Sequence, residues 1–136
     1  MESKTIKIQD GVLDIAMRLL FILHNCEMMM SRDRLAVYCY ISSTGNSKRI
    51  GRASSYVGIE KTIGKSIHYL MSKQLLTFSH NADYNLYGLT NIGLALVLEL
   101  NKESYSSIIN SEINKANSLL KDVSDDELSK YIKMQI

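Results

Sequence analysis

The chain has 136 residues, of which 46% are hydrophobic, so it is long enough for one domain with its own core. Its 16 basic and 14 acidic side chains give a net charge of +2, too small by itself to indicate nucleic-acid binding. The only cysteines, Cys26 and Cys39, form no Cys-x-x-Cys motif, so a disulfide framework is not supported and we expect two reduced, buried thiols. Because no apolar run could span a bilayer and no secretory signal pattern is present, we expect a soluble, cytoplasmic protein.

The first predicted element is an N-terminal arm. Residues 1–10 are polar, and the alternation of Ile6 and Ile8 predicts a short strand or a frayed arm there. Residues 12–23 then carry a wide apolar stripe, which predicts a central helix that is buried almost all round. Asp14 and Arg18 stand at i, i+4 in this segment and can pair on the helix surface.

A second helix is predicted after a loop that contains residues 28–30. Ser31 is a suitable N-cap for it, and the helix is expected to end near Ser43. Turn-forming residues follow at positions 42–47, and the next stretch is a basic loop with Lys48, Arg49 and Arg52.

The pattern between residues 59 and 96 is the most informative in the chain. Apolar side chains recur at helical spacing on one face, at Ile59, Ile63, Ile67 and Leu70. The period then changes to two, since Leu76, Phe78 and His80 alternate before the turn at residues 81–83, and residues 84–88 supply a return strand. Thr90 precedes the next apolar run and is a good N-cap. A helix, a hairpin and another helix in this order predict a winged helix.

Two further helices are predicted at the C-terminal end. Residues 105–120 have an amphipathic pattern whose apolar face must meet either the core or another protein. Ser124 and Glu127 form a capping box before a last short helix. The predicted fold is therefore mainly α with a small β-hairpin wing, a single winged helix-turn-helix domain over residues 1–136. It divides into an arm (1–10), a winged-helix core (11–100) and a helical extension (103–136).

The charge distribution suggests a nucleic-acid-facing surface. Between residues 44 and 73 the chain has six lysine or arginine residues and only one acidic residue, Glu60. In a DNA-binding helix-turn-helix the helix before the wing enters the major groove while basic loops contact phosphates. The candidate DNA-contacting residues are Lys48, Arg49, Arg52, Lys61, Lys65, His68 and Ser72. The alternative is a helix face that is simply solvated, and the helix lacks arginine or other good base readers.

Three catalytic or ligand-binding alternatives are weak. The string Gly58 to Ser66 resembles a phosphate-binding P-loop, but it has five residues rather than four before Gly-Lys-Ser and keeps helical period. His24, Cys26 and Cys39 lack the paired spacing of a structural zinc site. No Gly-x-Ser-x-Gly motif indicates a nucleophile. We therefore expect a protein that is not an enzyme, with no cofactor and no metal.

Several segments resemble the small middle component of ABC three-component conflict systems, which include the Lamassu-type SMC-like defence complexes. Residues 12–23 are similar to that family's acidic-x-x-x-Arg-x-Leu opening helix. Residues 34–41 are similar to its Leu-x-x-x-Asp-Tyr segment, although Cys39 stands in place of the Asp. Residues 84–93 and the helical tail through Leu120 also look like the family's C-terminal half.

The resemblance implies a non-catalytic adaptor that bridges an SMC-like or ABC ATPase and an effector, often a nuclease, in defence against phage or plasmid DNA. Exposed apolar helix faces usually mark partner sites, and the candidate residues are Tyr105, Ile108, Ile109 and Ile113. Double-stranded DNA is a further expected contact, and a membrane is not. The alternative is a dimeric winged-helix transcription regulator, so a homodimer stays open.

Overall fold

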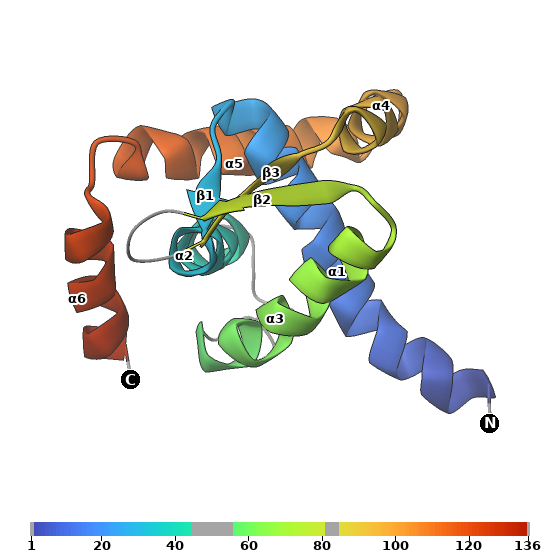
Figure 1. Ribbon diagram of the computed structural model, residues 1–136, viewed down its shortest axis with the longest axis horizontal. Coiled ribbons are helices and arrows are strands. Elements are labelled where there is room, and N and C mark those ends of the chain that lie inside the picture. Colours follow the sequence, from blue (N-terminus) through green and yellow to red (C-terminus); the bar gives the residue numbers. More distant parts are fainter. Residues whose placement is uncertain (1, 45–55, 81–84, 136) are drawn as a thin grey trace.

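The computed structural model describes residues 2–44, 56–80 and 85–135 of the chain. These residues form six helices and a small three-stranded antiparallel sheet, so the predicted mainly helical α+β class is confirmed (Figure 1). The elements are α1 (Glu2–Cys26), β1 (Met30–Ser31), α2 (Arg32–Thr44), α3 (Tyr56–Ser72), β2 (Leu76–His80), β3 (Asn85–Leu89), α4 (Asn91–Leu100), α5 (Ser106–Leu120) and α6 (Asp125–Gln135).

Helix α1 is longer than the sequence predicted. It begins at Glu2, so residues 2–10 continue the helix instead of forming a strand or an arm. This segment contains no proline, and its Glu, Lys and Gln residues favour a helix. Gly11 inside the helix costs about 0.5–1 kcal/mol relative to alanine, which is too little to end it. The N-terminal turns extend beyond the rest of the molecule (Figure 1).

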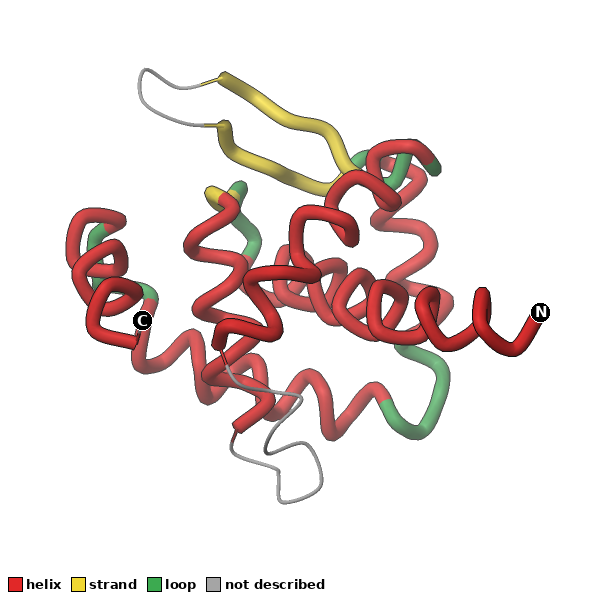
Figure 2. Tube along the Cα trace, turned by 90° about the horizontal axis from the view of Figure 1, so that it is seen from below, coloured by secondary structure: helices red, strands yellow, loops and turns green. Residues whose placement is uncertain are grey.

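The hairpin forms as predicted and gains a third strand. β2 and β3 are antiparallel, with Leu76 opposite Leu89 and Phe78 opposite Tyr87. β1 pairs with the other edge of β3, where Met30 lies opposite Tyr87, so the strand order is β1-β3-β2. Residues 28–30 were predicted to lie in a loop, because a strand of two residues is too short to show a period. Figure 2 shows the hairpin standing off one side of the helices.

Three helix starts that were predicted from caps are confirmed. The Ser31 hydroxyl accepts the backbone N–H of Arg34 at 3.1 Å, and the Thr90 hydroxyl accepts that of Gly93 at 2.9 Å. Before α6, Ser124 Oγ accepts the N–H of Glu127 at 3.2 Å while Glu127 Oε1 accepts the N–H of Ser124 at 3.1 Å. Each cap satisfies N–H groups that the first helical turn leaves without a partner.

The core lies where α1, α2, α3 and α5 meet. Each helix contributes a fully buried side chain to it, namely Phe21, Tyr38, Ile63 and Ile113. The apolar face predicted for α3 is buried as expected. The apolar face of α5 also packs against α1 and α2, so the C-terminal helices belong to the same hydrophobic core rather than to a separate appendage.

Polar contacts join the C-terminal helices to the rest of the molecule. Arg18 does not use Asp14, as its i, i+4 spacing suggested, but donates to Glu112 Oε1 of α5 at 3.2 Å and to Ser42 Oγ at 3.1 Å. The buried Arg34 of α2 pairs with Asp125 of α6 at 3.0 Å. A long-range partner replaces the local one because Arg18 is half-buried between helices, where a guanidinium needs protein acceptors.

Candidate nucleic-acid interface

Helix α3 presents a polar stripe to solvent. Lys61, Lys65, His68 and Ser72 return to one side of the helix because they are spaced by three or four residues. All four are exposed, whereas the isoleucines of the opposite face are buried. The prediction that these residues lie on the solvent face is confirmed.

Two side-chain hydrogen bonds join α3 to α1 and to α2. The fully buried Ser66 donates its hydroxyl to the carbonyl of Val12 in α1 at 2.9 Å. Arg32 of α2 donates to the carbonyl of Glu60 at 3.3 Å. Its guanidinium lies beside Gly64, where an added Cβ would make an ordinary van der Waals contact with Nη2 at 3.5 Å. Arg32 thereby adds an exposed positive charge beside the stripe.

A second cation lies at the end of α3. The ammonium of Lys73 is 5.7 Å from the centre of the Tyr69 ring, within the range of a cation–π contact. Tyr69 is 37% exposed, and its carbonyl accepts the Ser72 hydroxyl at 2.7 Å. We define the basic face as Arg32, Lys61, Lys65, His68, Ser72 and Lys73.

Few negative charges oppose the basic face. From Lys61 to Leu98 the sequence contains one acidic residue, Asp83, which lies outside the described residues. The half-buried Glu60 precedes this stretch, and Asp33 follows Arg32 on α2. The described residues of α3 after Glu60 and of β2 and β3 therefore include no acidic side chain.

The structure brings only part of the predicted DNA-contacting set together. Lys48, Arg49 and Arg52 lie outside the described residues. The P-loop-like string from Gly58 to Ser66 is continuous helix within α3. Its backbone therefore follows the helix and does not curl into a phosphate-binding loop.

The two cysteines are not activated nucleophiles in this structure. Burial raises the pKa of the Cys39 thiol to about 12, against a smaller lowering by the Arg18 charge. Burial likewise raises the pKa of Cys26 to about 11, and Arg34 lowers it slightly. Both side chains are therefore neutral thiols at pH 7. Among the residues that the structure describes, no three His, Cys, Asp or Glu side chains are grouped to hold a metal ion.

The predicted partner residues divide into exposed and buried sets. Tyr105 and Ile108 are 39% and 59% exposed, as a partner contact requires. Ile109 is half-buried against the core. Ile113 is fully buried, so its assignment as a partner contact is wrong. The face that it occupies on α5 is covered by the molecule's own α1 and α2.

Sequence reasoning missed the apolar surface of α4. One side of this helix, with Gly93 and Val97, is buried. Elsewhere the helix exposes Ile92 at 54%, Leu94 at 39% and Leu98 at 51%. Leu94 and Leu98 share one side at i, i+4 spacing, and we define this pair as the apolar face of α4. A signal was present in the sequence, because α4 is hydrophobic all round and has Glu99 as its only charged residue. Such a helix is normally buried on more than one side.

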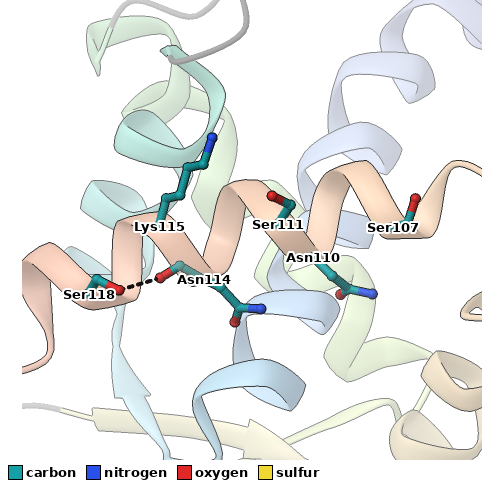
Figure 3. A pocket seen from close by; sticks show the side chains of 6 residues that line it. All are labelled: Ser107, Asn110, Ser111, Asn114, Lys115 and Ser118. Carbon is teal, nitrogen blue, oxygen red and sulfur yellow. Dashed lines mark hydrogen bonds between the residues drawn. The ribbon is translucent and has the colours of Figure 1, made fainter.

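A shallow hollow lies along the outer side of α5 (Figure 3). Its lining residues all belong to α5 and are Ser107, Asn110, Ser111, Asn114, Lys115 and Ser118. Within it Ser118 donates to the carbonyl of Asn114 at 3.0 Å, a bond inside the helix. Because no second element contributes side chains, polar groups do not converge on a ligand position.

No protein-family model, curated protein or solved structure matches this chain. In the described part of the chain, no helix combines the length and the apolar content needed to cross a membrane.

Proposed function

We propose that the chain is a winged-helix domain that contacts duplex DNA through the basic face. The element order α1, β1, α2, α3, β2, β3, with β1 on the outer edge of β3, supports this assignment. In a helix-turn-helix protein the second helix of the motif lies in the major groove while the first crosses the backbone. Here those helices are α3 and α2, and Arg32 begins α2 beside the exposed side of α3.

The exposed stripe of Lys61, Lys65, His68 and Ser72 carries this proposal. Lysine and serine side chains suit phosphate contacts, which position a protein without reading sequence. The described part of the basic face offers no asparagine or glutamine for bidentate contact with adenine, and its one arginine, Arg32, lies at the edge of α3. We therefore expect binding that is nonspecific and steeply weakened by salt.

The double variant Lys61→Glu/Lys65→Glu tests the DNA contact. It should abolish measurable affinity for a fluorescent duplex while the circular dichroism spectrum stays unchanged, because both side chains are exposed. The matched control is Lys115→Glu/Lys121→Glu, which makes the same charge change at exposed positions of α5 and just after it. Equal losses for both pairs, or no loss for the α3 pair, would remove α3 as the DNA-facing element.

We further propose that the domain is the non-catalytic accessory subunit of an SMC-like or ABC ATPase defence complex and bridges the ATPase to an effector nuclease. The resemblance of the chain to middle components motivates this role. The apolar face of α4 supports it, since an exposed apolar patch often marks a protein contact, and Tyr105 and Ile108 are further exposed apolar side chains.

Co-expression with a neighbouring ATPase subunit tests the adaptor role. The wild-type chain should co-purify with the ATPase at moderate salt, and Leu94→Asp/Leu98→Asp should abolish this without unfolding the domain. Leu119→Asp is the matched control, because Leu119 is 69% exposed but lies on α5. Failure of the wild-type chain to co-purify would contradict the adaptor proposal.

A dimeric transcription regulator is the second candidate, and the same apolar face favours it because a second copy could cover it. Such a regulator would bind its own upstream DNA more tightly than random duplex. Equal affinity for the two across a salt series would contradict operator recognition. A monomeric mass in light scattering would contradict the dimer.

A further inference from the structure

The hairpin has an exposed aromatic pair that the duplex contact does not use. Phe78 on β2 lies directly opposite Tyr87 on β3, with ring centroids 6.4 Å apart and ring planes at 46°. Phe78 is 50% exposed and Tyr87 is half-buried. The exposed part of an aromatic ring contributes no hydrophobic free energy until another surface covers it.

The aromatic pair continues a surface that begins in the core. Leu76 and Leu89 form the cross-strand pair at the base of the hairpin, and Leu76 is buried. Because side chains alternate along a strand, the Phe78–Tyr87 pair is next on the same side, and the His80–Asn85 pair follows it. His80 Nδ1 lies 2.9 Å from Asn85 Oδ1. The hairpin extends beyond the helices (Figure 2). Along this side of the hairpin, from its base outward, the side-chain pairs are therefore first apolar, then aromatic and then polar.

A lysine of the basic face precedes the strand that carries Phe78. Lys73, at the end of the basic face, stands five positions before Phe78 in the chain and already packs on the Tyr69 ring. The described residues of β2 and β3, and of α3 after Glu60, include no acidic side chain. Exposed aromatic rings on strands that carry no acidic side chain, joined to a basic helix, are a combination that can bind unpaired nucleotides through base stacking and phosphate attraction.

We infer that the Phe78–Tyr87 pair binds the unpaired bases of DNA that adjoin a duplex on the basic face. Bases within an intact duplex are already stacked on one another, so these rings gain little from it. An unpaired base has a free π-face, and stacking tolerates any sequence. Binding of any base sequence is consistent with a basic face that has no asparagine or glutamine for bidentate contacts with adenine. The inference rests on the proposed DNA contact and adds the DNA structure that the domain prefers.

Fluorescence anisotropy with the full chain tests this preference. One probe is a blunt duplex, and the other is the same duplex with a short single-stranded thymine extension. The wild-type chain should bind the extended duplex about tenfold more tightly. Phe78→Leu should remove the preference and leave the affinity for the blunt duplex unchanged, because it keeps apolar contact with Tyr87 but removes a ring. Tyr105→Leu, which removes an exposed ring from the turn before α5, should keep the preference.

A 2-aminopurine base in the extension gives a second readout, since its fluorescence falls when it stacks on an aromatic ring. Quenching by the wild-type chain and not by Phe78→Leu is the expected result. Equal affinity of the wild-type chain for both probes, or an undiminished preference in Phe78→Leu, would overturn the inference and leave the duplex contact standing. Binding to the extended probe without binding to the blunt duplex would instead contradict the proposed function.

Discussion

The guanidinium Nε of Arg34 lies 3.0 Å from Oδ1 of Asp125, and this ion pair joins α2 to the last helix of the chain. Arg34 also donates to the backbone carbonyls of Leu120, at 3.3 Å, and Val123. Its side chain is only 8% exposed, so the charge depends on these acceptors. One arginine therefore fixes the end of α5, the turn after it and the start of α6 to the core.

Removal of this arginine should loosen the C-terminal helices. We expect Arg34→Ala to lower the free energy of unfolding by about 3 kcal/mol, because it removes the donor to two backbone carbonyls and one side of a partly buried ion pair. Asp125→Asn should cost less, about 1 kcal/mol, because Asp125 is 31% exposed and the amide oxygen can still accept. Urea unfolding followed by circular dichroism measures both losses. A larger loss for Asp125→Asn than for Arg34→Ala would contradict this account.

The start of α4 should tolerate no side chain at Gly93. A Cβ there would clash with the backbone carbonyl oxygen of Leu75, which also accepts the N–H of Thr90 at 3.1 Å. Since the clash involves backbone on both sides, we expect Gly93→Ala to cost more than about 3 kcal/mol. Gly11→Ala is the control. It meets no atom within 4 Å inside α1 and should stabilise the protein by about 0.5–1 kcal/mol. Similar unfolding midpoints for the two variants would contradict the close approach.

An aspartate should unfold the domain on the buried side of α3 but have little effect on its exposed side. Ile63 is fully buried, so Ile63→Asp places an unpaired charge in the core and should unfold the domain at a cost of several kcal/mol. Lys65→Asp, two residues later on the exposed side, should leave the thermal unfolding midpoint nearly unchanged. A cooperative, native-like unfolding transition for Ile63→Asp would overturn the assignment of the two faces.

Local signals in the sequence predicted much of the fold. The isoleucine period identified α3, and the change to period two identified β2 and β3. Ser31, Thr90 and Ser124 marked helix starts because a cap involves only the next few residues. The exposed stripe of the candidate interface followed from the same reasoning, since the polar face of an amphipathic helix lies opposite its buried apolar face.

Features that depend on tertiary contact could not be predicted in this way. The two residues of β1 are too few to show an alternating pattern, and they form a strand because they pair with the edge of β3. The apolar pattern of α5 predicts that the side with Ile113 is buried, but it does not tell which surface buries it. In the structure, α1 and α2 cover this side. The Arg32 contact with α3 and the unpaired side of α4 likewise depend on how the helices are arranged.

The buried thiol of Cys39 should make the protein less stable at alkaline pH. Burial raises its pKa from 9.0 to about 12, so the folded state keeps the proton that the unfolded state releases. The effect is absent below pH 9, and above it the free energy of unfolding should fall by about 1.4 kcal/mol per pH unit until the folded pKa is reached. Cys39→Ala removes this contribution while every lysine still titrates, so its unfolding free energy should decline less steeply in urea titrations across this range. Parallel declines for the wild-type chain and the variant would show that Cys39 ionises equally in both states, and hence that it is not buried.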